Sequence, residues 1–236
     1  MRIGSDYKKI ELEAFGLDLL EPNAMFGDVI IFFISLFIAF KVARMPIQGP
    51  FFVYWRAFFV VFGISFLFGG LGHLLYNYLG VPGKYLSWYL GIFAVFLVER
   101  AMLSIHHKEG FRRFFFLITS IKLLVALLGA TAVFVFVDLE TDPSLGLRVT
   151  TLNTLVGLLF ALGYLGYKYS KSISLVFKTL YISVFILVPT VFLQTMKISF
   201  HPWFDRNDAS HVLLVAGLIM YYTGIKAYQK HLSYKY

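Results

Sequence analysis

The chain contains no cysteine and few charged residues, and both shortages narrow what it can be. Without cysteine it forms no disulfide and no thiolate metal site, so any bound metal needs histidine, aspartate, glutamate or asparagine ligands. Only 14% of its 236 residues are charged, whereas a soluble domain normally carries about a quarter. A surface so poor in charge is not wetted by water, which indicates that the chain lies in a lipid bilayer.

Apolar residues take the place of the missing charges. Hydrophobic residues make up 59% of the chain, and the mean hydropathy is +0.76. Crossing the hydrocarbon core takes about 20 apolar residues in a helix. Seven runs meet that requirement: 24–43, 51–80, 85–105, 112–137, 146–168, 173–198 and 207–229. None shows the two-residue alternation of a barrel strand, so we expect an all-α integral membrane bundle of seven transmembrane helices. We expect residues 1–236 to form this single domain.

Residues 1–23 precede the first expected helix and contain no continuous apolar run. We therefore expect no cleavable signal peptide there. We expect instead a short amphipathic segment on the extracytoplasmic surface of the membrane.

Basic residues are concentrated on one side of the expected bundle. The segments around 41–56, 99–113 and 164–178, with the tail from Lys226, hold 13 of the 21 Lys and Arg and only two acidic residues. The positive-inside rule places this side in the cytoplasm, with the N-terminus outside and the C-terminus inside. Because the charges are spread over four membrane-flanking segments, they do not indicate nucleic-acid binding. We expect a multi-pass protein of a cell membrane, and the short chain favours a bacterial inner membrane.

Four polar residues from three expected helices fall at one depth, near the outer ends of those helices. They are Asp28 in the first helix, His73 in the second, and Asp208 and His211 in the seventh. Ionisable groups are costly inside a membrane, which makes each a functional candidate. Asp208 and His211 lie three residues apart and share one helical face, which suits a chelating pair. Plainer roles remain open, because His73 could bond between helices and Asp28 or Asp208 could cap a helix.

Other ionisable residues have simpler expectations. Glu99 and Arg100 should reach the cytoplasmic interface from the end of the third helix. His106 and His107 should lie in a solvated loop. Lys122 falls in the middle of the fourth helix without a partner evident from the sequence. Either it pairs with a carboxylate, or that helix is shifted along the membrane.

These residues resemble those of the alkaline ceramidases and of the wider superfamily of seven-helix membrane hydrolases, which includes the adiponectin-receptor and haemolysin-III families. The stretch before the first helix, DLLEPN, is similar to the calcium-binding segment of the ceramidases at Asp18, Glu21 and Asn23. His73 and His211 correspond to zinc ligands of the family. The resemblance therefore implies a zinc site, with His73, Asp208 and His211 as its ligands here, and a calcium-like site at Asp18, Glu21 and Asn23.

The sequence also departs from the family pattern at several positions. Asn207 stands where the family has the first histidine of its seventh helix. Gly69 stands where the family has a serine, although Ser65 lies one turn earlier. The family aspartate that follows the histidine of the second helix has no counterpart.

The sequence supports three hypotheses about function. The first is a zinc-dependent hydrolase of a lipid amide or ester in the outer leaflet, in which zinc activates a water molecule. Asp28 and Ser65 are then the candidates for the catalytic roles of the family aspartate and serine, which this sequence lacks at the usual positions. The second is a receptor or binding protein of the same fold without turnover, which the missing family residues favour. The third is a haem protein with His73 and His211 as axial ligands, in which Asp208 would have no role.

Overall fold

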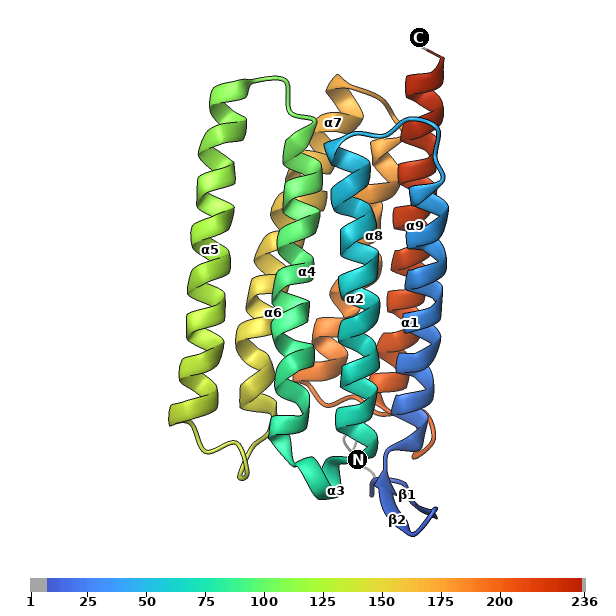
Figure 1. Ribbon diagram of the computed structural model, residues 1–236, viewed down its shortest axis with the longest axis vertical. Coiled ribbons are helices and arrows are strands. Elements are labelled where there is room, and N and C mark those ends of the chain that lie inside the picture. Colours follow the sequence, from blue (N-terminus) through green and yellow to red (C-terminus); the bar gives the residue numbers. More distant parts are fainter. Residues whose placement is uncertain (1–7, 235–236) are drawn as a thin grey trace.

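The computed structural model describes residues 8–234, and its long helices form one bundle (Figure 1). Among the described residues, seven helical spans are long and apolar enough to cross a membrane. They are Pro22–Ala43 (α1), Pro50–Leu74 (α2), Val81–Ser104 (η1 and α4), Glu109–Phe136 (α5), Ser144–Ser172 (α6, η2 and α7), Phe177–Thr195 (α8) and Arg206–Ser233 (α9). The expectation of a helical, multi-pass membrane protein is confirmed.

The second span is shorter than the sequence indicated. We expected a helix over 51–80, but α2 ends at Leu74 and is followed by the short helix α3 (Tyr76–Leu79) and by the 3-10 turn η1 (Val81–Lys84). The apolar run continues through the turn, so hydropathy alone does not mark the end of the helix. Gly80, with a φ of +57°, provides the backbone conformation that leads into η1.

The fifth span changes its helical type along its length. It consists of α6 (Ser144–Leu158), a π-helical segment η2 (Leu159–Leu165) and α7 (Gly166–Ser172). π-Helical segments within α-helices are found often at functional sites. In the third span, by contrast, η1 is followed by one regular α-helix, α4 (Tyr85–Ser104). The expected helix over 146–168 therefore corresponds to a longer span that is not uniformly α-helical.

The segment before α1 is a β-hairpin, where we expected only an amphipathic surface segment. Strands β1 (Glu11–Ala14) and β2 (Leu17–Leu20) pair antiparallel, with Glu11 opposite Leu20. Phe15 and Gly16 connect them, and both have positive φ angles, as a two-residue hairpin turn of type I′ requires. The hairpin lies at one end of the bundle, and the C-terminus lies at the other (Figure 1). We call these the hairpin end and the C-terminal end.

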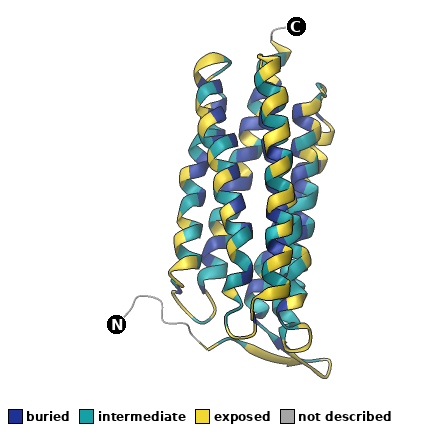
Figure 2. Ribbon diagram, turned by 90° about the vertical axis from the view of Figure 1, so that its left-hand side faces the viewer, coloured by how far each residue is buried: buried dark blue, intermediate teal, exposed yellow. Residues whose placement is uncertain are grey.

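Exposed residues occur along the whole length of the bundle (Figure 2), and many of them are large and apolar. Helix α5 shows this most clearly, with Phe114, Leu117, Ile118, Ile121, Leu124, Val125, Leu128, Val135 and Phe136 all exposed. Such a surface suits lipid as the surrounding solvent.

The main cluster of buried apolar side chains includes many residues in the half of the bundle near the C-terminal end. Trp55, Phe59, Tyr169 and Phe177 are among the largest fully buried side chains there. Trp55 lies near the start of α2, and Phe177 is the first residue of α8, so both belong to the C-terminal half. The hairpin half is packed differently, because it encloses a cavity.

Candidate functional site

A cavity of about 300 Å³ extends from the hairpin end to the middle of the bundle, between α1, α2, α4, α6, α8 and α9. Its apolar wall includes Phe58, Phe62, Phe66, Trp88, Leu187 and Leu214. Its polar wall comprises Asp28, Ser65, His73, Lys84, Ser87, Thr150, Thr151, Thr154, Thr190, Gln194 and His211. A mostly apolar cavity of this size with a few convergent polar groups is typical of a site for a small molecule.

A carboxylate and an imidazole from two helices meet in this cavity. The Oδ1 atom of Asp28 in α1 lies 3.1 Å from Nε2 of His211 in α9, and both side chains are buried. Asp28 is therefore not a helix cap, and the residue at the N-cap of α1 is Glu21. The ring of Phe66 lies edge-on to the His211 ring, with 5.9 Å between their centroids. These contacts orient the imidazole within the cavity wall.

Glycines give Asp28 and His211 the room that they need. A Cβ atom on residue 27 would lie 2.2 Å from Nδ1 of His211, so the backbone of α1 lies directly against that ring. A Cβ atom on residue 70 would lie 2.9 Å from Cβ of Asp28. Gly70 therefore allows α1 and α2 to approach closely where Asp28 faces the cavity.

A second carboxylate–imidazole pair lies at the hairpin end of the same cavity. Oε2 of Glu21 lies 2.5 Å from Nδ1 of His73, and Nζ of Lys84 lies 3.3 Å from the same nitrogen. Burial opposes ionisation of Glu21, but His73, Lys9 and Lys84 outweigh it and hold the pKa of this carboxyl well below its usual range. His73 therefore links α2 to the residue that precedes α1, which agrees with the plainer of its two expected roles, a hydrogen bond between helices rather than metal binding.

The three residues expected to bind zinc are not brought together. Asp208 is the N3 residue of α9, where it accepts a 2.9 Å hydrogen bond from the Asp205 amide and a 2.7 Å bond from Asn23. His73 and His211 are each paired with a different carboxylate. Within residues 8–234, no group of three or more histidine, aspartate or glutamate side chains is placed to hold a metal. The donor set as arranged does not fit zinc, and the N-cap of α9 is Asp205 rather than Asp208.

The residues expected to form a calcium-like site are also divided. Asp18 lies exposed in β2, where its amide donates to the Tyr78 hydroxyl and its carbonyl accepts from Asn77. Asn23 is bonded to α9, and Glu21 to α2. Asp18 thus takes part in a different set of contacts from the other two residues.

Three residues of this region were not singled out from the sequence. Lys84 could have been noticed, because it is a lysine directly before an apolar span. Asp205 could have been found from the capping-box spacing that it forms with Asp208. Lys9 gave no signal, because its partners are set by the fold. Ser65, the other expected catalytic residue, lines the cavity and donates a 2.8 Å hydrogen bond to the Ser87 carbonyl.

Two expectations outside the cavity are wrong. Glu99 does not reach the interface but is buried and paired with Lys122, which also bonds to Asn153. His106 is not solvated, because it is buried and stacks on Phe111 with 4.2 Å between ring centroids. In both cases a neighbouring helix covers a residue that the sequence placed near water.

A family model described as a family of unknown function, DUF6962, matches residues 24–230. No curated protein and no solved structure matches the chain. The matched residues include Asp28, His73, Lys84 and His211, whereas the hairpin, Lys9 and Glu21 precede them.

Proposed function

We propose that this chain, which belongs to the DUF6962 family of unknown function, binds a lipid or a similar amphiphile in the cavity between its helices. The observation that carries the proposal is the cavity of about 300 Å³, which combines an aromatic wall with a polar end. An amphiphile matches that division, because its chain needs apolar surface and its head group needs hydrogen-bonding partners.

The lining of α2 supports a definite direction for the bound molecule. Phe58 and His73 both line the cavity and are fifteen residues apart, which corresponds to about 22 Å along a helix. The apolar chain would lie beside Phe58, Phe62 and Phe66, and the head group beside His73. Each buried methylene would contribute about 0.8 kcal/mol.

The packing of α6 and α8 supports entry from the bilayer. Both helices line the cavity, but α6 packs on α4 and α5, whereas α8 packs on α9. The fifth span reaches α8 mainly through η2 and α7, at the C-terminal end. With the hairpin end outside, as the basic residues favour, the route between α6 and α8 leads to the outer leaflet.

Binding is tested by titrating the purified full chain in nanodiscs with a fluorescent fatty-acyl probe. Gly91 lines the cavity, and a Cβ atom there would make only ordinary contacts, the nearest 3.4 Å from Thr150. A Gly91→Phe variant should therefore fill the cavity and abolish saturable binding. Leu128→Phe, on the exposed face of α5, should bind as the unaltered chain does. Equal binding by both variants would sink the proposal.

Hydrolysis of the bound lipid is a second candidate, and the Asp28–His211 pair favours it. Asp28, His211 and Ser65 line one cavity, and a histidine beside a carboxylate is a common general base. Nε2 of His211 bonds to Asp28 and Nδ1 faces the backbone of α1 at Gly27, so this function requires the ring to turn until one nitrogen faces the substrate. Turnover of ester and amide lipids should then be lost in His211→Ala and kept in His107→Ala, an exposed histidine. Probe binding without any turnover would leave a binding protein or receptor. The haem hypothesis gains no support, because both histidines are paired with carboxylates.

A further inference from the structure

We propose that Lys9 is the resident cation of the Glu21 and Asp205 carboxylates at the hairpin end, where the resemblance to the ceramidases implies calcium beside Glu21. Its ammonium fastens the residues that lead into strand β1 to the start of α1 and of α9. This inference concerns the strand and the carboxylates, and it holds whether or not the cavity binds a lipid.

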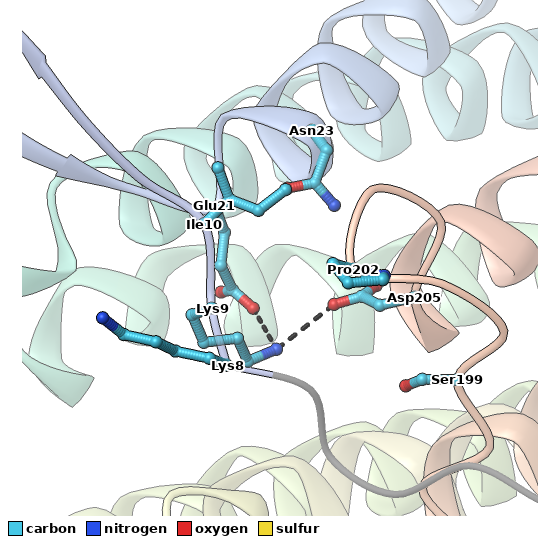
Figure 3. A pocket seen from close by; sticks show the side chains of 8 residues that line it. All are labelled: Lys8, Lys9, Ile10, Glu21, Asn23, Ser199, Pro202 and Asp205. Atoms are coloured by element: carbon cyan, nitrogen blue, oxygen red, sulfur yellow. Dashed lines mark hydrogen bonds and ion pairs between the residues drawn. The ribbon is translucent and has the colours of Figure 1, made fainter.

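One ammonium group serves two buried carboxylates from opposite ends of the sequence. Lys9 Nζ forms an ion pair with Glu21, and it lies 3.2 Å from Oδ2 of Asp205 (Figure 3). The Glu21 and Asp205 side chains are only 7% and 8% exposed, whereas that of Lys9 is 36% exposed. The cation therefore approaches from the solvent side and closes over the two acids.

The oxygen atoms around this pair are of the kind that calcium prefers. Glu21 and Asp205 meet at Lys9, Asp208 shares the α9 capping box with Asp205, and Asn23 bonds to Asp208 at 2.7 Å. Buried carboxylates need a counter-charge, because an unpaired buried charge is strongly destabilising. Lys9 supplies that charge from within the chain.

The lysine stays charged in this position. Burial favours its neutral form, but Glu21 and Asp205 outweigh burial and raise the pKa of Lys9 above its usual value. A backbone hydrogen bond holds the two segments together beside this ion pair, because the Glu21 amide donates a 2.9 Å bond to the carbonyl of Ile10, the residue after Lys9. Glu21 itself has a φ of +51°, an unusual conformation for a residue other than glycine.

The contact lies next to the cavity. Glu21 binds Lys9 through Oε1 and His73 through Oε2, and His73 lines the cavity. The carboxylate of Glu21 therefore connects Lys9 to His73 at the polar end of the cavity. Lys8 offers a matched control, because its side chain is 85% exposed and pairs with Glu11, an exposed residue at the start of β1.

The test compares the full chain in nanodiscs with its Lys9→Met and Lys8→Met variants, in excess calcium and in excess chelator. Hydrogen exchange of residues 10–21 and the Tm are measured. We expect the unaltered chain to be indifferent to calcium. Lys9→Met should exchange faster in residues 10–21 and lose about 2–4 °C or more in Tm, whereas Lys8→Met should match the unaltered chain.

Two results would overturn the inference. Calcium that slows exchange or raises the Tm of the unaltered chain would mean that a metal, rather than Lys9, is the resident cation. Lys9→Met and Lys8→Met variants that behave alike would mean that the Lys9 contacts do not hold the strand.

Discussion

Glu99 of α4 and Lys122 of α5 form an ion pair deep in the bundle, with 3.2 Å between Oε1 and Nζ. Lys122 also donates a 2.7 Å hydrogen bond to Oδ1 of Asn153 in α6. A Cβ atom on residue 157 would lie 3.2 Å from Glu99 Oε1 and 3.3 Å from Lys122 Nζ, so the small glycine of α6 gives the pair its space. The pair therefore fastens α5, the span with the smallest buried share, to its two neighbours.

Removing one partner of this pair should destabilise the bundle. Lys122→Met leaves the carboxylate of Glu99, whose side chain is 2% exposed, without its counter-charge. We expect a loss of about 3–5 kcal/mol in the free energy of unfolding. The double variant Glu99→Gln/Lys122→Met should recover most of that loss. Denaturant unfolding in detergent measures both, and a Lys122→Met variant as stable as the unaltered chain would refute this role.

Gly27 should be needed for the Asp28–His211 pair. In Gly27→Ala the new Cβ atom would lie 2.2 Å from Nδ1 of His211, so the ring must move away from its position. We expect a loss of about 1–3 kcal/mol in stability and weaker binding of the fatty-acyl probe.

Gly129→Ala provides the matched control for that substitution. A Cβ atom there has its nearest contact 3.8 Å away, at Val149, which is ordinary van der Waals distance. Because alanine favours a helix over glycine, this variant should be unchanged or slightly more stable. Two alanine variants with the same stability and the same probe affinity would argue against close packing at Gly27.

Acidification should remove the contribution that the ionised Glu21 carboxylate makes to the stability of the folded chain. Its pKa in the folded chain lies below the ordinary value of 4.5, so its contribution is complete above that pH and is lost as the pH falls. The Tm of the unaltered chain should exceed that of Glu21→Gln near neutral pH, and the difference should shrink at about pH 3. A difference that stays constant between these two conditions would contradict the assignment.

The spans were predictable because their signal is local. Each needs only a run of apolar residues of sufficient length, and all seven runs correspond to helical spans. The hairpin was missed although Leu12, Ala14, Leu17 and Leu19 alternate with polar or turn residues. Its turn is Phe15–Gly16 rather than one of the usual Asn–Gly or Asp–Gly pairs, so the strongest hairpin signal was absent.

The candidate site was predictable only in part. Depth along the helices indicated that Asp28, His73 and His211 lie near one level, and all three line one cavity. The partner of each residue depends on how helices face each other, which the spacing within one helix does not contain. Asp208 illustrates this limit, because its hydrogen bonds to Asn23 and to the Asp205 amide place it in a helix cap.

The orientation of the bundle is directly testable, because the chain has no cysteine to give background labelling. Phe15→Cys places a thiol at the fully exposed tip of the hairpin. Arg113→Cys places one on an exposed position of α5 near the opposite end. A membrane-impermeant maleimide should label the first in intact cells and the second only after permeabilisation. The reverse pattern would place the hairpin end in the cytoplasm.

The central claim is that the cavity holds an amphiphile, and native mass spectrometry of the purified full chain tests it most directly. We predict one bound molecule of lipid mass per chain that survives removal of the detergent, and its absence from the Gly91→Phe variant. The Leu128→Phe variant should carry the same bound mass as the unaltered chain. A chain that carries no such mass even after incubation with membrane lipids, or a Gly91→Phe variant that retains it, would contradict the claim.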